Sequence, residues 1–155
     1  MQVSEVHNFI DMRQQHINNN IMAPTGHLGI PRNRMPQIDS IYANQFLDFI
    51  KAAGVKVRYI RVPAKSLKLA QGEYNRDKVA SMISKGESNI TPITISQDGF
   101  VIDGMHRLIA KLNMPHSKSS YMNVIELGMD AIPLLDLIGT CKYVRYRNIN
   151  DVVVH

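Results

Sequence analysis

Apolar residues recur along the chain at two spacings, one typical of helices and one typical of strands. Residues 4–18 and 39–53 carry apolar side chains three or four positions apart, which predicts two amphipathic helices. Asp39 or Ser40 can cap the second helix, and Gly54 can end it. Three more helices are predicted from their start and stop residues, from Asn75 to Gly86, from Met105 to Leu112 and from Asp130 to Ile138.

Strands are predicted where β-branched and aromatic residues alternate with polar ones or form short apolar runs. Residues 55–62 alternate apolar and basic side chains, which is typical of a strand. Asp98-Gly99 is typical of a hairpin turn between strands at Ile93–Ile95 and Phe100–Ile102. Two further strands are predicted at Tyr121–Leu127 and, at an edge, Tyr143–Val154, and the Gly- and Pro-rich stretch Ala23–Pro36 is predicted to be an ordered loop or arm.

Because helices and strands alternate, the predicted fold class is mixed, α+β. The 155 residues suit one compact unit with one core. Within it we expect residues 1–54 to form an N-terminal helical arm packed on the core. Residues 55–155 are expected to form the main domain.

Composition and charge narrow the function classes. The chain is 45% hydrophobic and 20% charged, which predicts a globular protein. No apolar run reaches the roughly 20 residues of a membrane helix, and the N-terminus has no secretion signal, so we expect no membrane partner. The single cysteine, Cys141, fits the cytoplasm. A net charge of +5 suits partners that carry phosphates, although many small proteins are basic without such a partner.

Aromatic residues make up only 6% of the chain, and Trp is absent. A surface on which nucleic acid bases stack is therefore not indicated by composition. The chain also lacks the glycine-rich loops of the common nucleotide-binding folds. Its histidines lack the spacing of a zinc site.

The run Asp103-Gly104-Met105-His106-Arg107 carries the strongest chemical signal, because it joins a predicted strand to a predicted helix. Asp103 is expected to cap the helix, and Gly104 to let a phosphate approach the backbone. The free amides of the first turn favour an anion. His106 and Arg107 place cations there at a cost of roughly 0.3–1 kcal/mol each, which a bound phosphate would offset. Alternatively, Arg107 pairs with Asp103, and His106 is a buried, hydrogen-bonded histidine.

Residues from Val57 to Leu112 resemble the N-terminal domain of ParB proteins and their relatives, the sulfiredoxins and free-serine kinases. The order of predicted elements is similar, and Gly104, Arg107 and Ala110 match the Gly-x-x-Arg-x-x-Ala box of the ParB relatives. Gly104-Met105-His106-Arg107 resembles the Gly-Cys-His-Arg of sulfiredoxins, and Lys78-Val79-Ala80-Ser81 resembles their ATP-contacting Lys-Val-x-Ser. The similarity covers a third to two fifths of the chain.

The resemblance implies a small mixed sheet flanked by helices that binds a nucleoside di- or triphosphate (ATP, ADP or CTP), with Mg²⁺. Asp103, or alternatively Glu73, would then orient the metal, a water or an acceptor hydroxyl, for NTP hydrolysis or kinase-type transfer. Glu73 could equally be a solvent-facing loop acid. The implied catalytic residues are Glu73, Asp103, His106 and Arg107, and the implied phosphate- or nucleotide-binding residues are Gln71, Lys78, Ser81, Gly104, Met105, His106 and Arg107.

Departures from the family leave other functions open. Met105 stands where sulfiredoxins have their nucleophilic cysteine, so sulfiredoxin activity is not expected. The chain is too short for the helix-turn-helix and dimerisation domain of ParB, so a full partition role is not expected either.

The alternatives are a DNA-binding protein or nuclease of phage or plasmid origin, or a non-catalytic interaction protein, in a bacterial or phage-infected cell. Homo-oligomer formation is left open. A nuclease needs convergent carboxylates, for which Glu73 and Asp103 are the candidates. The enzyme hypotheses weaken if these two side chains do not converge on one cavity. The candidate DNA contacts are Arg32, Arg34, Arg58 and Arg61, with Lys65 and Lys68 nearby.

Overall fold

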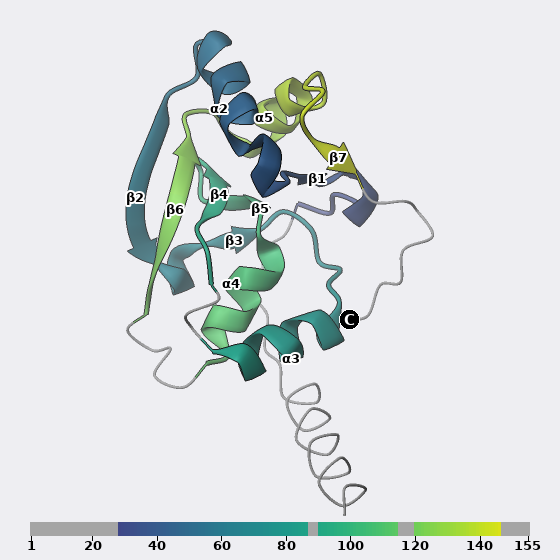
Figure 1. Ribbon diagram of the computed structural model, residues 1–155, viewed down its shortest axis with the longest axis vertical. Coiled ribbons are helices and arrows are strands. Elements are labelled where there is room, and N and C mark those ends of the chain that lie inside the picture. Colours follow the sequence, from purple (N-terminus) through teal and green to yellow (C-terminus); the bar gives the residue numbers. More distant parts are fainter. Residues whose placement is uncertain (1–27, 87–89, 115–119, 147–155) are drawn as a thin grey trace, which may run out of the picture.

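The computed structural model describes residues 28–86, 90–114 and 120–146 (Figure 1). This part of the chain confirms the mixed α+β class. The α-helices are α2 (Ala43–Ala52), α3 (Arg76–Lys85), α4 (Met105–Leu112) and α5 (Ala131–Ile138), and the 3₁₀ turns are η1 (Arg32–Arg34), η2 (Ser40–Tyr42) and η3 (Ala64–Ser66). The strands are β1 (Pro36–Gln37), β2 (Val57–Pro63), β3 (Lys68–Leu69), β4 (Ile93–Ser96), β5 (Phe100–Asp103), β6 (Tyr121–Leu127) and β7 (Arg145–Tyr146).

The main sheet has five strands in the order β2-β6-β4-β5-β3. The β2/β6 and β4/β5 pairs are antiparallel, whereas β4/β6 and β3/β5 are parallel. A separate two-stranded sheet joins β1 to β7, with Pro36 opposite Tyr146. Residues near both ends of the described chain therefore meet beside the main sheet.

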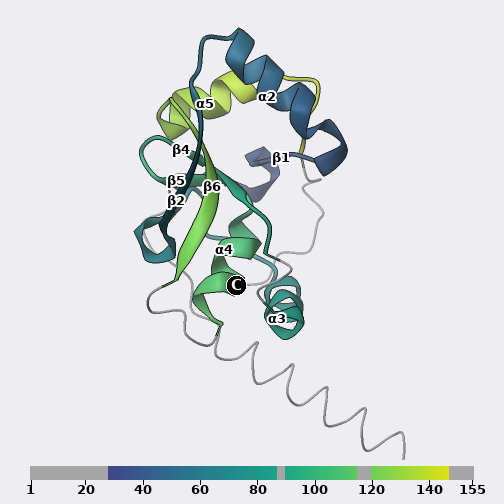
Figure 2. The ribbon, with the colours of Figure 1, turned by 60° about the vertical axis from the view of Figure 1, so that its left-hand side comes forward.

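Helices cover both faces of the sheet, α2 and α5 at one end of the molecule and α3 and α4 at the other (Figures 1 and 2). The described chain has two cores, one on each face of the sheet, where its length predicted one, and alternation along β5 explains the difference. Val101 points to the core that contains Leu108 of α4, while Phe100 and Ile102 point to the core that contains Phe46 of α2. Both faces of the sheet are buried here: all four residues of β4 are buried, Thr94 and Ser96 included, and β5 begins with the apolar run Phe100-Val101-Ile102.

Most predicted elements are present, with shifted ends. The second predicted helix begins as the 3₁₀ turn η2 and becomes α-helical only at Ala43. Neither Asp39 nor Ser40 caps α2: Tyr42 holds the cap position, and no side chain bonds there. The two-residue strand β3 was not predicted, because two residues show no periodicity.

Some predictions lie wholly or partly outside the described residues. The predicted helix at 4–18 is one of these. So are residues 23–27, the start of the predicted Gly- and Pro-rich loop. Of the predicted tail strand, residues 145–146 form β7, and those after 146 are not described. No helix within the described ranges is both long and apolar enough to cross a membrane.

Candidate functional site

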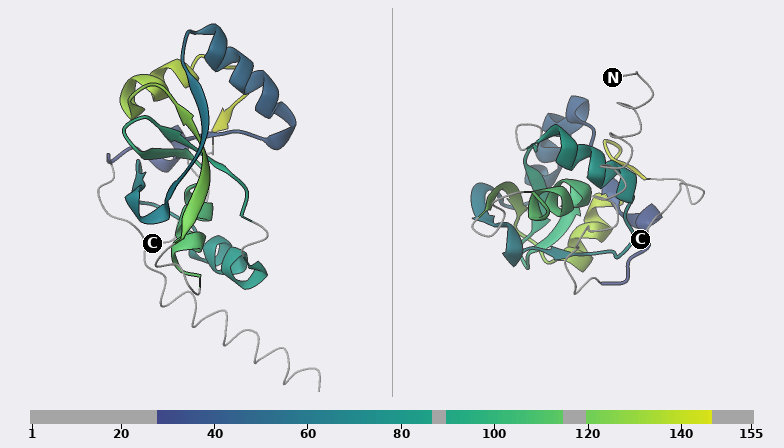
Figure 3. Two further views of the ribbon diagram at one scale, coloured as in Figure 1. Left: turned by 90° about the vertical axis from the view of Figure 1, so that its left-hand side faces the viewer. Right: turned by 90° about the horizontal axis from the view of Figure 1, so that it is seen from below.

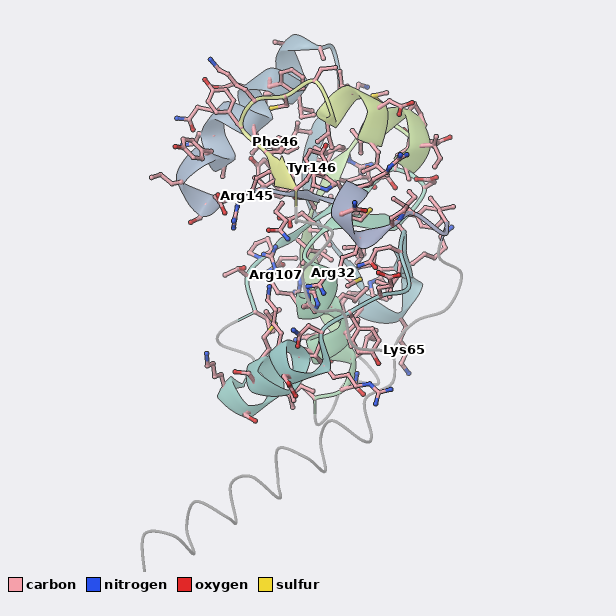
Figure 4. All side chains as sticks on the ribbon, turned by 90° about the vertical axis from the view of Figure 1, so that its right-hand side faces the viewer. Arg32, Phe46, Lys65, Arg107, Arg145 and Tyr146 are labelled. Carbon is pink, nitrogen blue, oxygen red and sulfur yellow. The ribbon has the colours of Figure 1, made fainter. Side chains whose placement is uncertain are left out.

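A cavity of about 200 Å³ lies where β5 ends and α4 begins. The wall of this cavity includes residues of η1 and β1, and Ile38 and Asp39, which follow β1. Lys78 of α3 and Arg145 of β7 complete the wall. Arg32 and Arg107 lie between the end of the molecule that carries α2 and α5 and the end that carries α3 and α4, with Arg145 nearby (Figure 4). The Asp103–Arg107 run thus lines a cavity, as do Gln71 and Lys78, two of the other predicted ligands.

Gly104 makes the sharp turn from β5 into α4. Its φ of +106° lies in the left-handed region, which disfavours any side chain. A Cβ at this position would clash with Ile93, approaching its Cβ to 2.8 Å, and would lie 2.9 Å from the Arg107 guanidinium. Protein atoms therefore fill the space that we expected to be left open for a phosphate.

Asp103 does not cap α4, which corrects the sequence-based prediction. The cap position belongs to Gly104, and no side chain bonds there. The Asp103 carboxylate instead lies 3.4 Å from Nη2 of Arg107. Burial raises the pKa of Asp103 above its ordinary value, while Arg107, the backbone N–H of Ile38 and the charge of Lys78 lower it. Asp103 thus lies in the cavity wall as a carboxyl group with an increased affinity for a proton.

Arg107 has a structural role as well as a place in the cavity wall. Its Nη1 donates to Oγ1 of Thr91 at 2.7 Å and to the carbonyl oxygen of Pro92 at 2.6 Å. With the Asp103 contact, the guanidinium ties the segment before β4 to the end of β5. This arrangement matches the alternative in which Arg107 pairs with Asp103, although the side chain still faces the cavity.

His106 is buried, with 8% of its surface exposed. Its Nε2 accepts the backbone N–H of Asn75 at 3.0 Å, so this nitrogen carries no proton and the ring is neutral in this arrangement. Asn75 in turn caps α3 by accepting the backbone N–H of Lys78. His106 therefore corresponds to the buried, hydrogen-bonded alternative, and it helps to position Lys78.

Gln71 holds the loop that leads into α3. Its Nε2 lies 2.7 Å from Sδ of Met105, and its Oε1 accepts the backbone N–H of Glu73 at 2.7 Å. Neither Glu73 nor Ser81 lines the cavity, although both were predicted site residues. Glu73 and Asp103 therefore do not converge on this cavity, which weakens the enzyme hypotheses, including the nuclease.

Positive charge predominates in the cavity wall. Arg145 lies 3.0 Å from Asp39, and Arg107 is paired with Asp103. Arg32, only 5% exposed, is not the solvated loop residue that its position in a Gly- and Pro-rich stretch indicates. The wall holds four cationic side chains and two carboxylates, a formal excess of two positive charges: Arg32, Lys78, Arg107 and Arg145 against Asp39 and Asp103.

Sequence reasoning missed Asp39 and Arg145 as site residues. They are 106 positions apart and meet only because β1 pairs with β7. No local pattern marks such a contact. Among the residues that the structure describes, no three His, Cys, Asp or Glu side chains gather as a metal-ligand set.

The predicted DNA contacts other than Arg32 lie outside this cavity. Arg58 forms an exposed ion pair with Glu126 at 3.1 Å, and the Arg61 guanidinium lies 5.7 Å from the ring centroid of Tyr121. Arg34 is exposed on η1. These arginines therefore form no common site with Arg107.

Comparison with protein-family models, with curated proteins and with solved structures gave no match to this chain. The resemblance to ParB proteins and sulfiredoxins therefore stays a prediction. The function is argued below from the chemistry of the cavity.

Proposed function

We propose that this protein binds the phosphate groups of a nucleoside di- or triphosphate in the cavity between β5, α3 and α4. The observation that carries the proposal is the formal excess of two positive charges in the cavity wall. Lys78 belongs to the first turn of α3, and Met105, His106 and Arg107 form that of α4. Helix N-termini provide a favourable dipole for an anion, although the Lys78 amide is already bonded to Asn75.

The size of the cavity limits which part of the ligand it holds. Sites that enclose a whole small molecule measure roughly 300–1,000 Å³. At about 200 Å³, this cavity suits phosphate groups, and the ribose and base would lie along its opening. ATP, ADP and CTP all satisfy this requirement.

Phosphoryl chemistry, by NTP hydrolysis or kinase-type transfer, would rest on positioning and charge neutralisation. Arg32 and Lys78 would neutralise the phosphates, and Asp103 would accept a proton from a water or hydroxyl. Mg²⁺ binds through one or two carboxylates together with phosphate oxygens. Asp39 and Asp103 offer such oxygens, but each is already paired with an arginine, so they would hold the ion only jointly with the ligand.

Lys78→Gln is the sharpest test, because Lys78 is solvent-exposed at the cavity and its loss should leave the cores intact. Isothermal titration with ATP, ADP and CTP, with and without Mg²⁺, should show binding that weakens roughly 10- to 150-fold in this variant, the effect of a lost charge-assisted hydrogen bond. Lys51→Gln, an exposed lysine of α2, is the matched control and should bind normally.

Equal affinities in wild type and Lys78→Gln, or no binding of any nucleotide, would refute the proposal. Phosphate release from ATP or CTP then separates an enzyme from a non-catalytic binder. With Glu73 outside the cavity, Asp103→Asn should abolish any such turnover, since Asp103 is the candidate proton acceptor within it.

A further inference from the structure

A second surface with binding chemistry lies on β2 and β6, which run side by side at one edge of the sheet (Figure 3, left). The register places Arg61 opposite Asn123 and Pro63 opposite Tyr121. Because side chains alternate along a strand, Tyr59 shares this face with Arg61 and Tyr121. We call Tyr59, Arg61, Pro63, Tyr121 and Asn123 the β2–β6 face.

The β2–β6 face points away from the core beneath α4. The alternate residues Ile60 and Val62 pack against that core, and Met122 and Val124 belong to it. Tyr59 is 67% exposed and Tyr121 is 52% exposed. Two aromatic rings thus lie open to solvent on one face of the sheet, where a partner could contact them.

Arg61 is the charged residue of this face, and β2, which carries it, contains no acidic residue. Residues 55–72 contain no acidic residue. The acid of β6, Glu126, lies opposite Arg58 on the other face and is paired with it. Of the basic residues in this stretch, Arg61 lies on the face and Lys65 follows β2 in η3, whereas Lys68 belongs to β3 at the opposite edge of the sheet.

We propose that the β2–β6 face binds single-stranded nucleic acid, with bases stacked on Tyr59 and Tyr121 and phosphates contacting Arg61 and Lys65. Aromatic rings flanked by cations are the chemistry by which proteins bind single strands without reading their sequence. The four-residue offset between Tyr59 and Pro63, which lies opposite Tyr121, separates the rings by about 14 Å along the strands, so they offer two stacking positions.

A protein partner fits this face less well. Interface cores are depleted in charge and form contiguous apolar patches. Here the guanidinium of Arg61 lies over the Tyr121 ring, and in the register Arg61 stands between Tyr59 and Pro63, the residue opposite Tyr121. Such a cation over an aromatic face also suits a nucleic acid, because the guanidinium can contact a phosphate or stack on a base.

Composition did not indicate this surface, since aromatic residues are few. The fold nevertheless places two of the six tyrosines, Tyr59 and Tyr121, on one exposed face, although they are 62 positions apart in the sequence. The inference does not depend on nucleotide binding, because the two surfaces share no residue.

The experiment is fluorescence anisotropy of the full chain with a labelled oligo(dT) of about a dozen nucleotides and with a duplex of equal length. We expect the single strand to bind more tightly, with an affinity that falls as salt rises. Tyr59→Ala and Tyr121→Ala should each weaken binding roughly 5- to 150-fold, and Tyr59→Phe should retain it, because phenylalanine still stacks. Tyr42→Ala, which removes a 44% exposed ring elsewhere, is the matched control.

Several outcomes would overturn the inference: no binding of oligo(dT), tighter binding of the duplex, or equal affinity in the tyrosine variants and wild type. Self-association that Tyr59→Ala abolishes, seen by analytical ultracentrifugation without oligonucleotide binding, would show a protein interface instead. Lys78→Gln should bind oligo(dT) normally. Loss of oligonucleotide binding in that variant would place the strand in the cavity and reject the β2–β6 face.

Discussion

The cavity and the β2–β6 face both present cations, but they hold them in different ways. In the cavity wall, Arg107 has three protein acceptors and Arg145 an acidic partner. On the β2–β6 face, Arg61 is exposed beside an aromatic ring. Removing a charge from water is costly unless hydrogen bonds replace the hydration, so the partly buried Arg107 is held in a fixed position by its three acceptors. Exposed ones attract an anion without fixing its geometry.

The difference bears on what each region can recognise. Fixed cations around a small cavity suit one compact anionic group, whereas exposed cations and rings suit a flexible polymer. It also means that Arg107 supports the fold, while Lys78 and the residues of the β2–β6 face, which are exposed, do not. Substitution of Arg107 should therefore change stability, and substitution of Lys78 or of a residue on the β2–β6 face should change binding alone.

The largest effect is expected from Gly104→Ala, at the turn into α4. A left-handed backbone costs a residue with a Cβ about 1–2 kcal/mol, and the clash with Ile93 adds about 1–3 kcal/mol. We expect the free energy of unfolding, measured in urea, to fall by about 2–5 kcal/mol. Gly54→Ala is the control, because Gly54 is also left-handed, at φ +84°, but has open space around it. Equal losses in the two variants would show that packing against Ile93 is unimportant.

The next largest effect is expected from Arg107→Ala, and it is compared with that of Arg61→Ala on the β2–β6 face. Arg107→Ala removes three charge-assisted hydrogen bonds and leaves Asp103 buried without its partner, which should cost about 1.5–3 kcal/mol in urea unfolding. Arg61→Ala should change the unfolding free energy by less than about 0.5 kcal/mol, since its side chain is exposed. Unchanged stability in Arg107→Ala would mean that this guanidinium serves the ligand alone, and the contrast between the regions would fail.

The sequence predicted the fold where periodicity or a stop residue was present. Alternation in 55–62 located β2, and the Asp98-Gly99 turn separated β4 from β5. Asn75, predicted as the start of a helix, caps α3. It could not predict β3 or β1, because two-residue strands exist only through their partners, β5 and β7.

The site was predicted only in part, for a similar reason. The Asp103–Arg107 run stood out because a glycine and two basic residues lie at a strand–helix junction. Two arrangements were left open for it, and the structure has the one in which Asp103 pairs with Arg107 and the His106 ring is buried and hydrogen-bonded. Which group satisfies a buried charge depends on tertiary neighbours such as Thr91, and these are not visible in a local pattern.

The smallest effect is a dependence on pH that is expected in the cavity. In the unfolded chain the Asp103 carboxyl titrates near its ordinary pKa of 3.8, and burial raises that pKa in the folded protein. Between the two values the folded state holds more protons than the unfolded state, so stability falls as pH rises through this window and is constant above it. Asp103→Asn has no proton to lose there. The unfolding free energy of the variant minus that of wild type should therefore rise with pH from about 3.8 and then level off.

Urea unfolding of both proteins across a pH series measures this difference. Asp103→Asn also loses the ion pair with Arg107, which changes the stability of the variant, so the test is the slope of the difference against pH and not its size. A difference that falls with pH would mean that the cations around Asp103 outweigh burial and keep the carboxylate charged. The formal excess in the cavity wall would then stay at two positive charges. A difference that rises means that Asp103 is neutral over part of the range. Four cations then face Asp39 alone, a formal excess of three positive charges in the cavity wall over that part of the range.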